Sequence, residues 1–421
     1  MTMRIFSSAQ ACGFGPISKL TAISPLFEGA TIDFTGRDVA LDFARRHVHR
    51  FTTITEGDTQ RHEDVAAGLA EADFVVSVMD AELVFWAVRA DVPVLFFDSL
   101  LSFWLTERGI EELAARAQLV RWSDDETARF VFDTLTPHER ILLAHLLATR
   151  SYAQNFPGVA ARIDSLTKAG ASHIQLCGPI VDRGALEAAL SAPAPDRIPD
   201  LLINLGGFQN FFLDYESHNA YLDLLRRWVV ELAAAQPELR RVLVCGGAFR
   251  ESVTETHGGV EIEYTMLPHK DFLRHLAHAP LYAVPPSLTS LHEAVILRKL
   301  PLLLPEQHYG HVTNLRALRG TAIGDNAASL IDLGTRFEVP EDDLEGTRAL
   351  DRLTRELLSD EAGYRSFADY LNKRLAGYRQ LTDSERDAAV DELGGLLGGP
   401  ALADLLARVS SDLPTPAGRT S

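Results

Sequence analysis

The stretch 281–314 contains residues whose types and spacing could bind a phosphate and a sugar. Thr289 and Ser290 stand where a helix should begin, after an apolar run and a Pro-Pro-Ser turn. Free backbone N–H groups and the positive end of the helix dipole make such a helix start a site for an anion. Glu293 ends the first turn, where its carboxylate could accept hydrogen bonds from two hydroxyls of one sugar. The pattern therefore predicts a phosphate and a ribose at one helix.

Gln307 and His308 add a polar pair on the next predicted loop, after a second apolar run at 302–304 that Pro305 ends. Together with the helix start, this pair describes a nucleotide-sugar pocket. A simpler interpretation stays open, because any buried strand–helix–strand unit can carry a Ser or Thr cap. Glu293 could then do no more than complement the helix dipole.

Glycines at the start of the chain offer a second place for a ligand. Gly13 and Gly15 follow a predicted strand at 4–12 and permit a tight turn with close backbone approach, and Ser18 could cap the next helix. As a dinucleotide fingerprint the segment is incomplete, because Ser18 replaces the third glycine and Pro16 interrupts the pattern. A tight turn without a ligand is the alternative.

The same combination of a buried strand and glycines occurs twice in the second half of the chain. Gly206 and Gly207 follow the apolar run 201–205, and another pair of glycines follows 242–245. Each pair places bare backbone at the end of a strand. The repetition indicates two similar domains that face a cleft.

Two carboxylates end predicted strands in the first half of the chain and are candidates for a general base. Asp80 follows a buried strand at 73–78, and Asp98 follows the run Val-Leu-Phe-Phe. Ligands of parallel sheets gather beyond the carboxyl ends of the strands. Asp98 could equally cap a helix.

The elements that must position these residues alternate between strand and helix patterns. Such alternation predicts parallel sheets covered by helices on both faces, an α/β fold with two Rossmann-like domains. The predicted organisation is an N-terminal domain at 1–183, a linker at 184–199, a C-terminal domain at 200–345, helices at 346–408 and a disordered tail at 409–421. Between 99 and 172 the pattern is mostly helical, and the polar-aromatic string 151–157 predicts an acceptor pocket or an ordered loop.

Composition excludes several classes of protein. The net charge of −18 argues against a nucleic-acid partner or an anionic membrane. Three distant cysteines form neither a zinc cluster nor a disulfide framework, and no signal peptide or apolar run of about 18 residues occurs. We expect a cytoplasmic protein without a cofactor. The sequence leaves the oligomeric state undecided between a monomer and a homodimer.

The segments TSLHEA and PEQH resemble the donor site of GT-B glycosyltransferases, in particular the MurG-like, UDP-sugar-dependent branch. The resemblance is strongest over 200–320. It implies that Thr289, Ser290 and the helix start hold phosphate, that Glu293 holds the ribose, and that Gln307 and His308 hold the transferred sugar.

The resemblance also implies roles for residues around these segments. Met266 and Leu267, with the Pro-His that follows, resemble the loop that holds the uracil by its backbone. Arg250 or His308 would neutralise charge on the leaving diphosphate, because no metal-binding Asp-x-Asp motif occurs in the expected context. Asp98 first and Asp80 second would be the base.

Three further motifs, FGPISKL, FFDSLLSFW and INLGGFQNFF, resemble the group that includes cytosylglucuronate synthase of nucleoside antibiotic biosynthesis. This narrower resemblance implies transfer from UDP-glucuronate to cytosine or a related pyrimidine.

Three other functions compete with a transferase. A UDP-sugar 2-epimerase would share the fold and the donor site. A non-catalytic nucleotide-binding protein would bind UDP without turnover. A nicotinamide oxidoreductase would use Gly13 and Gly15 as its phosphate turn and Asp33 as the acidic residue that closes the second strand.

Overall fold

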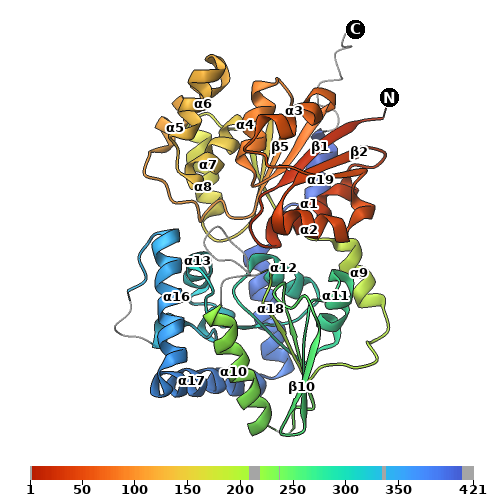
Figure 1. Ribbon diagram of the computed structural model, residues 1–421, viewed down its shortest axis with the longest axis vertical. Helices are drawn as coiled ribbons and strands as arrows, with labels where there is room; N and C mark the ends of the chain where they lie inside the picture. Colours follow the sequence, from red (N-terminus) through yellow and green to blue (C-terminus); the bar gives the residue numbers. More distant parts are fainter. Residues whose placement is uncertain (1, 208–218, 237, 334–337, 410–421) are drawn as a thin grey trace. The chain divides into compact units, whose positions relative to one another are not determined.

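The computed structural model describes residues 2–207, 219–236, 238–333 and 338–409, and the chain forms two compact units. Unit 1 comprises Met1–Asp182 and Leu396–Ser421, and unit 2 comprises Arg183–Gly395. Each unit contains its own sheet, and each sheet is surrounded by its own helices (Figure 1).

Unit 1 is built on a seven-stranded sheet in which every neighbouring pair of strands is parallel. The strand order is β3-β2-β1-β4-β5-β6-β7. The strands are β1 Arg4–Ala9, β2 Thr31–Gly36, β3 Thr53–Glu56, β4 Phe74–Val78, β5 Val94–Asp98, β6 Arg150–Gln154 and β7 Ile174–Cys177. The central strands β4 and β5 are buried along their whole length, as expected for a sheet covered on both faces.

The helices of unit 1 come from both ends of the chain. They are α1 Gly15–Ile23, α2 Asp38–Arg46, α3 His62–Glu71, α4 Ala81–Arg89, α5 Ile110–Trp122, α6 Asp125–Asp133, α7 Pro137–Leu147, α8 Val159–Lys168 and α19 Leu402–Val409. Short 3₁₀ helices cover Ser24–Leu26 and Val48–Arg50. Figure 1 shows α19, drawn in blue, among the red elements of this unit.

Unit 2 is built on a six-stranded sheet with the order β10-β11-β9-β8-β12-β13. Its strands are β8 Leu201–Asn204, β9 Arg241–Cys245, β10 Val253–His257, β11 Val260–Thr265, β12 Leu281–Val284 and β13 Leu302–Leu303. All neighbours are parallel except the edge strand β10, which pairs antiparallel with β11.

The helices of unit 2 include a long C-terminal set. They are α9 Arg183–Ser191, α10 Ala220–Ala235, α11 His269–His278, α12 Leu288–Ile296, α13 Tyr309–Leu318, α14 Ala322–Asp325, α15 Leu330–Leu333, α16 Asp343–Ser359, α17 Glu361–Gln380 and most of α18 Asp383–Leu397. Among the described residues no helix is long and apolar enough to cross a membrane.

The predicted fold class is confirmed, because the two halves of the chain form separate α/β units with mostly parallel sheets. The polar-aromatic string at 151–157 was predicted to form an acceptor pocket or an ordered loop. Its first residues instead belong to the inner strand β6, which covers 150–154. The predicted linker 184–199 begins with α9, whose alanines favour a helix. The finer domain limits stay a prediction, and 410–421 of the predicted tail lie outside the described residues.

Candidate active site

In unit 2, polar side chains meet where the order of the strands reverses. The chain moves from β8 outward to β9 and β11, and then returns to the other side of β8 to form β12 and β13. Ligands of such sheets bind beyond the carboxyl ends of the strands at this switch point. Asn204 ends β8, and its Nδ2 donates to Oγ of Ser290, in the first turn of α12, at 3.2 Å. This hydrogen bond joins the two sides of the switch point.

The glycines that follow β8 and β9 lie together at the same edge. Gly206 donates its backbone N–H to Oδ1 of Asn204 at 2.9 Å, and its carbonyl accepts from the N–H of Gly247 at 2.9 Å. Gly206 has φ of +69°, a left-handed conformation that favours glycine. A Cβ placed on it would meet no described atom within 4 Å. Gly207 follows and is buried.

The start of α12 lies one residue earlier than predicted, at Leu288. Thr289 and Ser290 therefore occupy its first turn, as an anion site at the helix start requires. Ser287 precedes the helix, and within the described part of the chain its side chain makes no capping hydrogen bond.

Glu293 is nearly buried and contacts a histidine from the preceding helix. Its Oε1 lies 2.7 Å from Nε2 of His269, the first residue of α11. Met266 and Leu267 lie just before that helix, after β11 ends at Thr265, and both are partly exposed. The loop expected to hold the base and the carboxylate expected to hold the ribose are therefore connected through His269.

Gln307 reaches the glycine turn, because its Nε2 donates to the carbonyl of Leu205 at 3.1 Å. His308 precedes α13, and the centroid of its ring lies 3.9 Å from that of His311. Burial lowers the pKa of His308 to about 4, so its imidazole is neutral at neutral pH. His308 can therefore offer hydrogen bonds but not the positive charge expected of it. Arg250 is exposed, in the turn after β9.

Unit 1 has the same kind of switch point, between β1 and β4, and Asp80 lies there. Its Oδ2 accepts from Oγ of Ser8 at 2.7 Å, across the switch point, and its Oδ1 accepts from Oγ1 of Thr59 and from the N–H of Leu83, both at 3.2 Å. The last of these bonds caps α4. Met79, just before it, has φ of +58°, which is uncommon for a residue with a side chain.

Burial raises the pKa of Asp80, because the charged form loses solvation, and the hydrogen bonds from Ser8, Thr59 and the N–H groups of Leu83 and Glu82 oppose this effect. Asp80 therefore has a raised affinity for a proton.

Asp98, the last residue of β5, has different surroundings. It is fully buried, and Oδ2 accepts from Nε1 of Trp104 at 2.6 Å and lies 2.8 Å from Nε2 of His145. Oδ1 accepts from the N–H of Leu100 at 2.6 Å. The other ring nitrogen of His145 contacts Oγ of Ser151 at 2.7 Å. The Ser-His-Asp chain is closed to solvent at all three residues, which fits a structural network and not a base that meets a substrate.

The glycine turn after β1 is tight, as predicted, with φ of +61° at Gly13. The cap prediction for Ser18 is wrong, because α1 already begins at Gly15 and the Ser18 hydroxyl donates to the Gly15 carbonyl at 2.9 Å. Asp33 lies inside β2, not at its end, and accepts from Thr53 Oγ1 at 2.6 Å. The interpretation as a nicotinamide oxidoreductase therefore lacks the acidic residue that it requires at the end of the second strand.

The structure thus joins Ser290, Gly206 and Gln307 through Asn204 and the Leu205 carbonyl, with Glu293 on the same helix as Ser290. Sequence reasoning missed Asn204, Ser8 and Thr59, and it placed His269 after the base-binding loop without its contact to Glu293. Asn204 carried a signal, since it is a polar residue that closes an apolar strand just before two glycines. The other three act through partners that are distant in the sequence.

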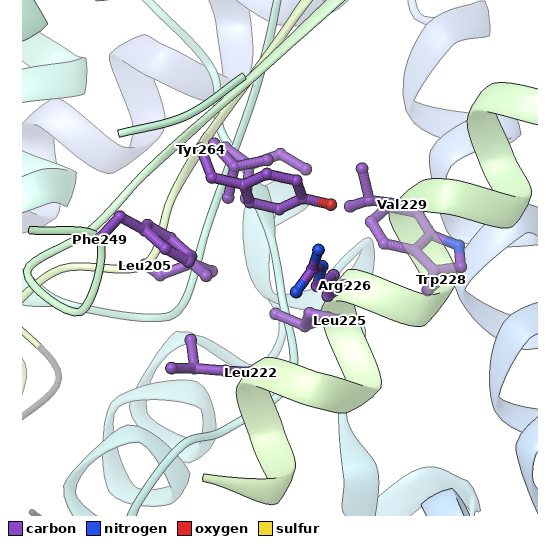
Figure 2. Close-up of a pocket in the computed structure, with 10 residues that line it drawn as sticks. Leu205, Leu222, Leu225, Arg226, Trp228, Val229, Phe249 and Tyr264 are labelled. Atoms are coloured by element: carbon purple, nitrogen blue, oxygen red, sulfur yellow. The ribbon is translucent and has the colours of Figure 1, made fainter. Parts of the chain in front are cut away.

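A small pocket elsewhere in unit 2 is apolar. Figure 2 shows it between α10 and the sheet, and none of the predicted site residues lines it. Its lining consists of Ile203, Leu205, Leu222, Leu225, Arg226, Trp228, Val229, Val244, Phe249 and Tyr264. In the part of the chain that the structure describes, no group of three or more His, Cys, Asp or Glu residues could hold a metal ion.

No protein-family model and no curated protein matches the sequence. Solved structures match along nearly the whole chain. LpCGTa in complex with UDP has a TM-score of 0.51 at 13% identity and covers 97% of this chain and 100% of its own. The spinosyn forosaminyltransferase SpnP has a TM-score of 0.51 at 12% identity, with 99% and 100% covered.

The spinosyn rhamnosyltransferase SpnG, complexed with thymidine diphosphate, has a TM-score of 0.50 at 15% identity and covers 97% of this chain and 100% of its own. At these identities the likeness shows the fold. The chain has the two-domain α/β fold of GT-B glycosyltransferases.

Proposed function

We propose that this protein is a glycosyltransferase that moves a sugar from a UDP-sugar or TDP-sugar to a small acceptor. The observation that carries the proposal is the convergence of Asn204, Ser290, Glu293 and Gln307 on the switch point of unit 2. Two structures of the same fold are complexes with UDP and with thymidine diphosphate. The three motifs described above favour UDP-glucuronate as donor and cytosine or a related pyrimidine as acceptor.

The donor is proposed to bind along the carboxyl edge of the sheet in unit 2. The first turn of α12, with Thr289 and Ser290, holds the diphosphate by its N–H groups, its dipole and its hydroxyls. Glu293 accepts hydrogen bonds from the ribose hydroxyls. Gln307 and the neutral His308 face the transferred sugar.

The remaining predicted donor residues lie around this edge. The backbone of Met266 and Leu267 holds the base, and Gly206 and Gly207 permit close approach of the donor. Arg250 is exposed and supplies the positive charge that the neutral His308 does not.

Asp80 is proposed as the general base, in place of Asp98. The acceptor forms a bond to the anomeric carbon, the bond from that carbon to the diphosphate oxygen breaks, and the acceptor proton moves to the Asp80 carboxylate. The raised pKa of Asp80 favours this transfer. The turn with Gly13, Gly15 and Ser18 lies after β1, beside β4 in the sheet order, and would border the acceptor.

Binding of a panel of UDP-sugars and TDP-sugars, followed by product analysis with acceptors that include cytosine, tests the proposal. We expect one donor to bind and a glycosylated product to form only when an acceptor is present. Release of an altered sugar without acceptor would indicate an epimerase. Binding without any turnover across the acceptor panel would indicate a nucleotide-binding protein.

A further inference from the structure

The contact between His269 and Glu293 joins two elements that the proposed donor site uses separately. Nε2 of His269 lies 2.7 Å from Oε1 of Glu293, and the two side chains are 21% and 5% exposed. A carboxylate oxygen can only accept, so His269 donates an N–H from Nε2. We propose that His269 is a positioning residue that holds the Glu293 carboxylate in the orientation that binds the ribose, an inference that rests on the proposed donor site.

The terminal torsion of a glutamate is broad, so a carboxylate without a partner would sample many orientations of its plane. The N–H of His269 restricts this freedom by fixing one oxygen. It occupies one of about four lone-pair positions, and the positions left are enough for the two adjacent hydroxyls of a ribose. A carboxylate that is oriented before the ligand arrives loses less entropy on binding.

His269 is also placed to link two parts of the donor. It is the first residue of α11, two residues after Leu267 of the loop with Met266, whereas Glu293 lies on α12. Pro268, between that loop and α11, restricts the backbone there. A base that displaces the loop would displace His269 and loosen the carboxylate. Recognition of the base and recognition of the ribose are therefore coupled through one side chain.

Affinities for UDP and for 2′-deoxy-UDP, measured by calorimetry on the full chain, test this role. Wild type should prefer UDP. His269→Ala should lose about 10-fold in UDP affinity, equivalent to about 1.4 kcal/mol, together with most of that preference. His269→Gln should keep most of both, because the glutamine amide nitrogen reaches the position of Nε2. In a Glu293→Ala background, His269→Ala should have no further effect.

His278→Ala is a matched control, since this histidine is on the same helix and its Nδ1 contacts the Arg274 carbonyl of that helix at 2.9 Å. It should behave as wild type does. If His269→Ala fails to fold, His269→Gln is compared with His269→Asn, whose shorter amide cannot reach Glu293.

The outcomes separate this inference from the proposed function. A wild-type protein that binds no nucleoside diphosphate would overturn the proposed function, and this inference with it. A wild type that prefers UDP, with a His269→Ala variant that keeps both the affinity and the preference, would overturn the role of His269 alone.

Discussion

Asp98 ends β5 and Asp80 lies two residues after the end of β4, but only Asp80 lies at the switch point of unit 1. Asp98 is fully buried among Leu100, Trp104 and His145. Their identical side chains allow the catalytic and the structural role to be compared directly.

Asp80→Asn should lower kcat by about 100-fold or more, because a general base contributes typically 10²–10⁴-fold. In the wild type the rate should rise with pH through the pKa of Asp80, which burial raises from its ordinary value. Because the pKa of Asp80 is raised in the folded state, its ionisation lowers the free energy of unfolding as the pH rises through that pKa. The neutral asparagine avoids this loss, so Asp80→Asn should not destabilise the fold at pH 7. Rates from pH 4 to 8 and melting temperatures check this.

Asp98→Asn is the control for that experiment. Its new amide group would face either the N–H of Leu100 or the donors Trp104 and His145, which leaves a buried donor unsatisfied. We expect a loss of about 1–3 kcal/mol of stability and a nearly unchanged kcat in the folded fraction. A large loss of kcat in a stable Asp98→Asn protein would identify Asp98, and not Asp80, as the general base.

At the scale of elements, the start of α13 is sensitive to acid. Burial lowers the pKa of His308 to about 4 and that of His311 well below its usual value. Below about pH 6.5 the unfolded chain binds protons at these histidines while the folded chain does not. Stability should therefore fall as the pH decreases from 6.5 toward 4, by at most about 1.4 kcal/mol per pH unit for each histidine.

Urea unfolding at pH 7, 5.5 and 4.5 measures this effect. His311→Asn keeps an acceptor for the N–H of Gln307 but cannot titrate, so it should flatten the dependence. His62→Asn removes a histidine from unit 1 and should leave the unfolding of unit 2 unchanged. Equal slopes for wild type and His311→Asn would exclude His311 as the cause.

The first turn of α12 is proposed to stabilise the negative charge of the diphosphate, so turnover should not need a divalent metal. We expect the rate to be the same before and after treatment with EDTA. A rate that vanishes with EDTA and returns with magnesium or manganese would assign that charge to a metal ion and contradict the proposed role of α12.

Most elements could be predicted because their apolar residues follow the period of a strand or a helix, as α4 does at Ala81–Arg89. β6 could not, since it mixes Ser151 and Gln154 with apolar residues. These polar groups are satisfied by His145 and by the N–H of Ile180, which no local pattern reveals. The site followed the same rule: Glu293 has a local signal, whereas His269 acquires its role only through a residue on the next helix.

At the scale of the whole molecule, unit 1 needs the end of the chain. Nδ2 of Asn155 donates to the carbonyls of Leu396 and Gly398, and the N–H of Gly178 donates to the Pro400 carbonyl at 2.7 Å. Gly178 and Gly399 are in such close contact that a Cβ on Gly178 would lie 2.7 Å from the Gly399 oxygen. The separation into two units was predictable from the sequence, but this return of the chain rests on contacts between residues far apart in the sequence.

A chain that ends at Gly395 should therefore lose stability in unit 1 and not in unit 2. Hydrogen exchange should show faster exchange in β6 and β7 and unchanged protection in β8 and β9. Gly178→Ala should have the same effect in a milder form. Gly377→Ala in α17, where a Cβ meets no described atom within 4 Å, is the control and should be neutral or slightly stabilising.

The arrangement of unit 1 also sets an order of events during synthesis. A ribosome releases Met1–Asp182 first, but Leu396–Val409, which complete that unit, emerge only after all of unit 2. Unit 2 is continuous in sequence and can close as soon as Gly395 leaves the exit tunnel. While the roughly 200 residues of unit 2 are translated, the edge near β7 lacks the segment that begins at Leu396. At that stage nascent unit 1 is incomplete although all strands of its sheet have been synthesised, and a chaperone could bind it.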